Sequence, residues 1–268
     1  MLEKEKIIRF VLDAGFDACG VAAADSLPHD AEFITQWLAN GNHADMYYLE
    51  RNFDKRTDVQ KLVEGAKTVV VCLLNHYTEY QQPEGEKKIA KFKLPATNYH
   101  TVIRRYLKNT EEKITTHYGA DIINKEQQHS FCDTAPILER RWAERAGLGW
   151  IGKNKLLINP RLGSFTNIGI LVLNDTCDAY STPIANQCGT CNICIKACPS
   201  GALSEGKMFD ARKCISYLTT ASKNPIPKKF QRITENVAFG CDACANQCPW
   251  NQHLQAHQNK DLQIKPKQ

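Results

Sequence analysis

The sequence predicts an α+β fold in which an amino-terminal α/β domain, with a mixed sheet flanked by helices, precedes a small cysteine-rich module. Three observations predict this architecture. Helical apolar periodicity alternates with short apolar runs through most of the chain, eight closely spaced cysteines follow, and the final stretch is polar without an apolar period. The expected segments are residues 1–178, residues 179–251 and a polar tail over residues 252–268.

Three helices are marked by apolar periodicity and by residues that start or stop a helix. The first is expected over residues 3–14, where apolar side chains recur at helical spacing before a glycine. The second is expected over residues 30–39. The third is expected over residues 98–118, with Asn98 as its N-cap and Gly119 at its end.

A fourth helix is expected before Gly147. Asp133 or Thr134 would cap this helix, and Pro136 would stand in its first turn, where a missing backbone N–H has no cost. The stretch GLGWIGKN, which ends at Asn154, follows. It is either a loop whose backbone approaches a polar or anionic ligand, or a tight turn between a helix and a strand.

Four short apolar runs predict the strands, at residues 18–24, 67–74, 155–158 and 167–173. The second of them, KTVVVCLL, is a continuous β-branched run, which is typical of a strand buried on both faces. The charged stretch between Tyr77 and Pro95 carries no such signal. It is expected either to move or to close over a ligand.

Composition places the chain among ordinary globular proteins. Its 268 residues are 43% hydrophobic and 24% charged, and no apolar run reaches the length of a membrane span. The first residues, MLEKEKIIRF, contain acidic side chains and no leader-like apolar region. We therefore expect a cytoplasmic protein without a membrane partner, in a reducing compartment that suits free thiols.

The net charge of +5 only weakly favours a polyanionic partner. Basic residues gather in three groups, each of which is more often a solvated face than a nucleic-acid contact. The groups are Lys87, Lys88, Lys91 and Lys93; then Arg104, Arg105 and Lys108; then Lys223, Lys228, Lys229 and Arg232.

The first four cysteines of the module follow the pattern of bacterial two-cluster ferredoxins. Cys188, Cys191 and Cys194 form a C-x2-C-x2-C run, and Cys198 precedes a proline. In that pattern the run supplies three ligands to one iron–sulfur cube, while the fourth cysteine ligates the other cube.

The second run is incomplete. Cys241, Cys244 and Cys248 keep their places, but Ala238 stands where the first cysteine is expected, and Cys214 is the obvious substitute. The predicted ligands are Cys188, Cys191, Cys194 and Cys248 for one [4Fe–4S] cluster, and Cys198, Cys214, Cys241 and Cys244 for the other.

Zinc ribbons and disulfides are the alternative explanations for these cysteines. Zinc sites usually combine two separated C-x2-C pairs around one tetrahedral ion, and they lack a triplet with a trailing Cys-Pro. Disulfides need an oxidising compartment. Both are therefore less favoured than iron–sulfur clusters.

Several longer motifs resemble those of the epoxyqueuosine reductase family. They are MYYLERNFDKRTD, DTAP-x-LE-x-x-W-A-x-x-AGLGWIGKN with its RLGSF tail, CISYLT after Cys214, and NPIP leading to FGCDACANQCPWN. The resemblance implies a cobalamin-binding amino-terminal domain and a ferredoxin-like module. It also implies reduction of epoxyqueuosine to queuosine at the wobble position of tRNA, with electrons passing through two clusters to a base-off cobalamin.

The resemblance further assigns roles to individual residues. Asp133 matches the family's proton donor, and a donor of this kind has to be shielded from water, so we expect it to be buried beside the corrin. The implied cobalamin contacts are Arg56, Asp133, Trp150, Gly152, Lys153, Asn154, Ser164 and Ser216. The implied partners are the anticodon stem-loop of tRNA, held by the basic groups, and an external electron donor, with the enzyme acting as a monomer.

The chain departs from the family pattern at Asn98, Ile170 and Ala221, where acidic residues are common, and most relatives continue well beyond the last Cys-Pro. These differences favour either a changed substrate or fewer tRNA contacts. Two other functions therefore stay open, namely a corrinoid reductase for a small molecule, as in reductive dehalogenases, and a ferredoxin-like electron carrier.

Overall fold

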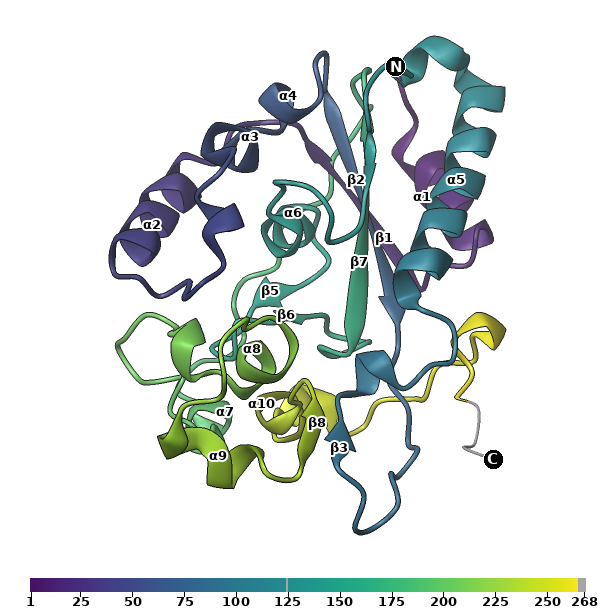
Figure 1. The fold of residues 1–268 in the computed structure, drawn as a ribbon. Helices are drawn as coiled ribbons and strands as arrows, with labels where there is room; N and C mark the ends of the chain where they lie inside the picture. Colours follow the sequence, from purple (N-terminus) through teal and green to yellow (C-terminus); the bar gives the residue numbers. More distant parts are fainter. Residues whose placement is uncertain (124, 265–268) are drawn as a thin grey trace.

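The computed structural model describes residues 1–123 and 125–264, and it confirms the α+β fold class (Figure 1). A four-stranded sheet has the order β1 (Ala18–Ala23), β2 (Thr68–Asn75), β7 (Thr166–Leu173) and β4 (Ser130–Phe131). Every pairing within this sheet is antiparallel. The mixed sheet that the sequence predicted for the amino-terminal domain is therefore wrong, because its sheet is antiparallel and the parallel pair of β3 with β8 belongs to a second, smaller sheet.

Strand β2 is buried along its whole length, as its β-branched run predicts. Val70, Cys72 and Leu74 face one side of the sheet, and the alternate residues face the other. Helices α1 (Lys4–Asp13) and α5 (Tyr99–Tyr118) cover the first side, to the right of the sheet in Figure 1. Burial of each large aliphatic side chain contributes roughly 1.5–3 kcal/mol, so these apolar faces fix the layer order.

Helix α5 has the predicted boundaries. The Asn98 side chain accepts a hydrogen bond from the His100 backbone N–H, at 3.0 Å, and satisfies one of the free amides of the first turn. Gly119 ends the helix at a φ of 94°, a conformation that favours glycine.

Helix α6 (Glu139–Arg145) covers the other side of the sheet. Its start corrects the sequence prediction, because neither Asp133 nor Thr134 is its N-cap and Pro136 lies before the helix. Asp133 instead has a left-handed backbone with a φ of 56°, and its N–H donates to the side chain of Glu139. This contact holds residues 133–138 as an irregular loop.

Three further helices complete this side, namely α2 (Pro28–Ala39), α3 (Phe53–Thr57) and α4 (Val59–Leu62). After α6 the chain forms a hairpin of β5 (Trp150–Ile151) and β6 (Leu157–Ile158). The predicted strand over residues 155–158 is thus shorter, because Lys155 lies in the hairpin turn with a φ of 66°.

The cysteine-rich module is built from short elements. They are α7 (Ile193–Lys196), α8 (Ile215–Thr220), α9 (Lys228–Thr234), β8 (Val237–Phe239) and α10 (Ala243–Asn246). Short 3-10 turns lie at Tyr47–Leu49, Lys91–Lys93, Ala120–Ile122, Ala211–Lys213, Pro249–Asn251 and Lys260–Leu262.

The module packs directly on the amino-terminal segment. Strand β3 (Lys88–Ile89), from the charged stretch after β2, pairs in parallel with β8. The Trp37 indole N–H of α2 donates to the Phe209 carbonyl at 2.6 Å, and Trp37 packs in a small apolar cluster with Phe230 of α9. Contacts of several kinds therefore cross the predicted boundary after residue 178.

Residues 252–264 of the polar tail form a strap across the amino-terminal domain. The His257 N–H donates to the Tyr77 carbonyl at 3.0 Å, and the Tyr106 hydroxyl donates to Asp261 at 2.6 Å. Leu262 is fully buried among α1 and α5 residues. Residues 265–268 of the predicted tail lie outside the described residues.

Within residues 1–123 and 125–264, none of the helices combines the length and the apolar character that crossing a membrane requires.

Candidate iron–sulfur and cofactor site

The cysteines of the first predicted cluster lie together. Burial, followed by the nearby Cys188 and Cys191, raises the pKa of the Cys194 thiol. Burial also raises the pKa of Cys248, with Cys188, Cys194 and Cys191 as the charged neighbours. The four sulfurs that the spacing assigned to one cube are therefore mutual neighbours in the fold.

The other four cysteines form a second group. Burial raises the pKa of Cys214, of Cys241 and of Cys244, the last to about 12, and neighbouring thiols add to each rise. Cys198 is a neighbour of all three. Cys214 therefore lies with the cysteines of the second run, as expected of a substitute for the ligand missing at Ala238.

Local backbone groups prepare these sulfurs to act as thiolate ligands. Burial raises the pKa of Cys198, but hydrogen bonds from the Leu203 backbone, from Ser200 and from the Ala202 backbone bring it below its ordinary value. The backbone N–H groups of Tyr217 and Ser216 likewise donate to Cys214. Such N–H···S bonds stabilise metal-bound sulfur and tune a cluster's potential.

Neither thiol group has the sulfur spacing of a tetrahedral zinc site. A tetrahedral zinc site with Zn–S bonds of about 2.3 Å places its sulfurs about 3.8 Å apart. Within residues 1–123 and 125–264, the only three ligand atoms of His, Cys, Asp or Glu that all lie within 4.8 Å of one another belong to His100, Cys132 and Asp133. In neither group of four thiols do three sulfur atoms all lie within 4.8 Å of one another.

Three of the predicted cobalamin contacts carry buried polar atoms without a hydrogen-bond partner. They are Nε of Arg56, Nε1 of Trp150 and Nδ2 of Asn154. Arg56 is 8% exposed, and burial lowers the pKa of its guanidinium. Leaving a buried donor unpaired costs about 1–3 kcal/mol, so these atoms fit a bound polar group such as the amide-rich rim of a corrin.

The hairpin itself is a packed turn that touches the module. A Cβ on Gly152 would meet Ile158 Cδ1 at 2.5 Å, so a larger residue there would force the neighbouring side chains to move. The Lys153 ammonium donates to the Asn192 side chain at 2.9 Å, and Trp150 packs against Cys188 and Cys248. These contacts agree with the tight-turn interpretation of GLGWIGKN and bring its residues to the first thiol group.

The two predicted serine contacts also lie beside the thiol groups. The buried Ser164 exchanges two hydrogen bonds with Asn251, at 2.8 and 2.7 Å, just after Cys248. Ser216 lies in the first turn of α8, next to Cys214. Arg56 instead comes from α3, where its guanidinium donates to the Tyr48 carbonyl at 3.3 Å.

Asp133 lies between the start of α5 and the start of α6. The Tyr99 hydroxyl donates to Asp133 Oδ2 at 2.5 Å, and the His100 Nε2 lies 3.4 Å from the same oxygen. Burial raises the pKa of Tyr99, and its hydrogen bond to Asp133 adds to the rise, so this phenol stays a donor. The Asp133 side chain is 51% exposed in the protein, so the burial expected beside the corrin would have to come in part from the cofactor.

Asn98, one of the departures, supports this arrangement. Its side-chain oxygen lies 2.9 Å from His100 Nδ1 and also caps α5, so the amide orients the histidine ring. Ile170 is fully buried in the core that faces α6, and Ala221 is the C-cap of α8. The altered residues thus serve orientation and packing.

Sequence reasoning missed two charged residues at the start of α6. Glu139 Oε1 accepts the Asp133 N–H at 2.6 Å, and burial followed by the Asp133 charge raises the pKa of Glu139 to about 8. Burial also lowers the pKa of the neighbouring Arg140, and it is the largest effect on that pKa. Glu139 is half-buried and Arg140 is exposed, so solvent still reaches both residues. We refer to the partly enclosed surroundings of Asp133, Glu139 and Arg140 as the recess. The glutamate in DTAP-x-LE was the available signal.

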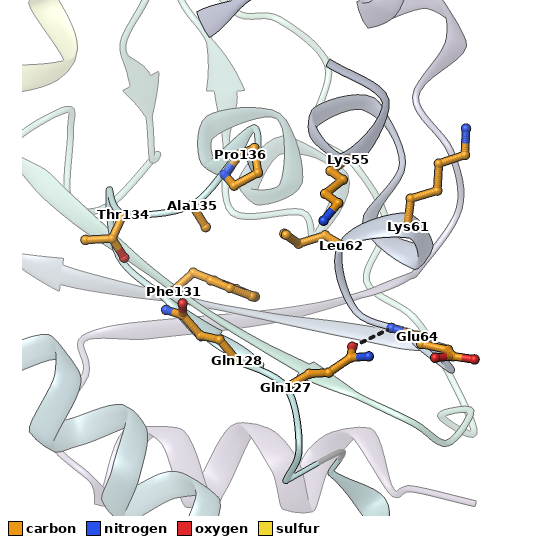
Figure 2. Close-up of a pocket in the computed structure, with 10 residues that line it drawn as sticks. All are labelled: Lys55, Lys61, Leu62, Glu64, Gln127, Gln128, Phe131, Thr134, Ala135 and Pro136. Atoms are coloured by element: carbon orange, nitrogen blue, oxygen red, sulfur yellow. Dashed lines mark hydrogen bonds between the residues drawn. The ribbon is translucent and has the colours of Figure 1, made fainter. Parts of the chain in front are cut away.

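A pocket of about 600 Å³ lies beside the Asp133 loop, between that loop and helices α3 and α4 (Figure 2). Figure 2 shows Phe131 between the two walls, with Lys55 and Leu62 opposite Ala135 and Pro136. The lining residues are Lys55, Lys61, Leu62, Glu64, Gln127, Gln128, Phe131, Thr134, Ala135 and Pro136. Two ammonium groups, one carboxylate and two amides give the pocket a net positive, hydrogen-bonding lining.

Two protein-family models match the chain. Residues 187–251 match the 4Fe-4S double cluster binding domain, which covers both thiol groups. Residues 56–134 match the model described as Epoxyqueuosine reductase QueG, DUF1730, which extends from Arg56 to just beyond Asp133.

Curated relatives match almost the whole chain. An epoxyqueuosine reductase of Leadbetterella byssophila is 41% identical over 258 residues, covering 96% of this chain and 83% of that protein. An epoxyqueuosine reductase of Cellulophaga algicola is also 41% identical, covering 91% of this chain and 77% of that protein.

Solved structures give the same result. An epoxyqueuosine reductase in complex with an epoxyqueuosine-modified stem loop of tyrosine tRNA superimposes with a TM-score of 0.88 at 27% identity, covering 97% of this chain and 68% of that chain. The catabolic reductive dehalogenase NpRdhA, at 16% identity and a TM-score of 0.54, covers 93% of this chain and 32% of that chain, and shows the fold alone. On these matches, the chain belongs to the epoxyqueuosine reductase family.

Proposed function

We propose that the chain reduces the epoxide of epoxyqueuosine, at the wobble position of tRNA, to the cyclopentene ring of queuosine. The observation that carries this proposal is the position of Asp133, which Tyr99 and His100 hold in the same fold as two separate groups of four thiols. A family member of this fold has been solved with an epoxyqueuosine-modified tRNA stem loop.

Cobalamin is the proposed second cofactor, since iron–sulfur clusters pass single electrons but do not by themselves break a C–O bond. When bound, it supplies a reduced cobalt centre for that bond. Arg56, Trp150 and Asn154 would hold its polar groups, because each offers a buried donor that lacks a partner within the protein. Lys153, Gly152, Ser164 and Ser216 would support the same site through the contacts that place them beside the thiols.

The side chains around Asp133 handle the proton. The departing epoxide oxygen needs a proton as its C–O bond breaks, and Asp133 would donate it. Tyr99 and His100 both contact Oδ2 of Asp133, so they fix the rotation of the carboxyl group. The other oxygen, Oδ1, would then face the substrate. The half-exposed position of Asp133 is what a donor requires when the substrate and the corrin complete its enclosure.

An external electron donor is expected to reduce the clusters in the cytoplasm, with the enzyme acting as a monomer. Two exposed apolar residues stand close in sequence to ligands of the first cluster, Ile193 beside Cys194 and Trp250 two residues after Cys248, and they are the proposed docking surface of the donor. Delivery at this surface would keep the electron path short and leave the recess beside Glu139 free for tRNA.

The most direct test is conversion of the nucleoside. We expect the purified protein, reconstituted without oxygen with iron, sulfide and cobalamin and then reduced, to convert epoxyqueuosine in tRNA to queuosine. Nucleoside mass spectrometry of digested tRNA measures the product. If an established family member converts the same tRNA in parallel and this protein does not, the proposed function is wrong.

The pocket beside the Asp133 loop predicts a contact with tRNA. Reversing its charge with Lys55→Glu and Lys61→Glu should weaken tRNA binding. The slope of log affinity against log salt should become shallower by about 0.7 for each single-strand phosphate that the variant no longer neutralises. Fluorescence anisotropy over a series of salt concentrations measures both effects. Arg9→Glu, on the opposite side of the sheet in α1, is the matched control. An unchanged salt slope in the double variant would remove the pocket from the tRNA interface.

A further inference from the structure

Reducing an epoxide to an alkene needs more protons than one carboxyl group holds. Two electrons and two protons are consumed, both C–O bonds break, the oxygen leaves as water, and a C=C bond forms. Asp133 can deliver one proton and must regain another before the second C–O bond breaks. The recess described above therefore needs a second proton-holding group within reach of Asp133.

We propose that Glu139 is this group, a positioning residue that holds the Asp133 loop in place and returns a proton to the Asp133 carboxylate between the two deliveries. This inference rests on the proposed function and deepens it. Nothing in the family match assigns a role to Glu139, and the helix start at this residue was not expected from the sequence.

Geometry is the first support. Glu139 Oε1 accepts the Asp133 backbone N–H at 2.6 Å. This hydrogen bond joins the two ends of the loop between β4 and α6. Asp133 has a φ of 56°, a left-handed conformation that costs a residue other than glycine about 1 kcal/mol or more unless its surroundings hold it. The hydrogen bond from Asp133 to Glu139 is the contact that holds it.

The charged surroundings of Glu139 are the second support. Burial and the Asp133 charge raise its pKa to about 8, and the positive charge of Arg140 opposes the rise. Near neutrality Glu139 is therefore mostly protonated and can donate to the Asp133 carboxyl, whose side chain lies within hydrogen-bonding reach. The titratable groups that face the pair are Tyr99 and His100 of α5, Cys132 of the same loop and Arg140 of α6.

The proton balance is complete with these groups. Asp133 protonates the oxygen as the first C–O bond breaks, and its carboxylate then takes the Glu139 proton. Asp133 delivers this second proton as the remaining C–O bond breaks and water leaves. Glu139 then regains a proton from solvent, which reaches the recess wall, while the electrons come from the external donor through the clusters.

Glutamine and alanine at position 139 separate the two roles. Glu139→Gln keeps an oxygen that accepts the Asp133 N–H but cannot return a proton, so kcat should fall about tenfold to a hundredfold with little change in KM for tRNA. Glu139→Ala also loses the acceptor and should fall further. The wild-type rate should decline as the pH rises through about 8, and this decline should be absent in Glu139→Gln. Glu112→Gln, exposed on α5, is the control.

A stability measurement tests the proton on Glu139 without any activity. A carboxyl whose pKa is raised on folding binds its proton more tightly in the folded state, so it stabilises below its unfolded pKa and loses this contribution as the pH rises through the folded pKa. The melting temperature of the wild-type protein, loaded with its clusters, should therefore fall relative to that of equally loaded Glu139→Gln between pH 4.5 and about 8.

The outcomes are distinct. If the wild-type enzyme converts tRNA while Glu139→Gln keeps its kcat and its decline above pH 8, the inference is wrong and the proposed function stands. If the wild type converts nothing, the proposed function is wrong. In that case the melting-temperature difference still decides whether Glu139 holds a proton, and a constant difference across this pH range would overturn the inference.

Discussion

Replacing Asp133 with asparagine is expected to lower the rate of epoxyqueuosine reduction by about a hundredfold to ten-thousandfold, the usual contribution of a general acid. The amide keeps the size of the side chain and an oxygen that accepts the Tyr99 hydroxyl, now bonded at 2.5 Å, but it has no acidic proton. Nucleoside mass spectrometry of tRNA after timed incubation measures the rate.

The Asp133→Asn variant should keep its clusters, because the partners of Asp133 are Tyr99, His100 and Glu139 and not the cluster cysteines. It should also keep its cobalamin, because asparagine preserves the size and the polar character of this predicted cobalamin contact. Iron content and the visible absorption of bound cobalamin measure the two. Asp121→Asn, on an exposed turn away from the recess, is the matched control. Conversion by Asp133→Asn at the wild-type rate would mean that another group donates the proton.

Replacing Cys214 with alanine should remove one of the two clusters. The second thiol group would keep three sulfurs, so bound iron should fall from about eight atoms per chain toward about four. Epoxyqueuosine reduction should then be lost, because the electron path to the reactive centre is broken. Iron analysis and electron paramagnetic resonance of the reduced protein measure the two clusters separately.

Cys19→Ala is the matched control for Cys214→Ala, since Cys19 belongs to neither thiol group. It is a free cysteine that lies opposite Cys72 in the pairing of β1 with β2. Full iron content in Cys214→Ala would mean that Cys214 is not a ligand. A variant at Ala238 provides the reverse test. If Cys214→Ala combined with Ala238→Cys regains the missing iron, the two positions serve the same cluster.

Elements with strong local signals could be predicted from the sequence. The N-cap at Asn98, the glycine at 119 and the β-branched run of β2 each act over a few residues, so no distant contact had to be known. The cysteine grouping was equally accessible, since ligand spacing is a geometric property of the cluster.

Features that depend on contacts between distant segments could not be predicted. The start of α6 was placed too early because the Asp133 N–H is taken by a side chain beyond the loop, and capping rules describe only the nearest turn. The unpaired donors of Arg56, Trp150 and Asn154 become visible only when burial is known. The activity could be predicted because the motif around Asp133 resembles that of a known family. The exposure of the Asp133 side chain and the raised pKa of Glu139 could be known only from the fold.

The parallel pairing of β3 with β8 has a consequence for how the protein matures. The strand β8 ends just before Cys241, so the segment that carries this ligand is also the segment that anchors the charged stretch after β2. If Cys241 binds the second cluster, insertion of this cluster orders the end of β8 next to its partner strand. We therefore expect a chain that lacks iron to be cleaved by proteases at β3 more readily than the iron-loaded chain, while the four-stranded sheet stays intact.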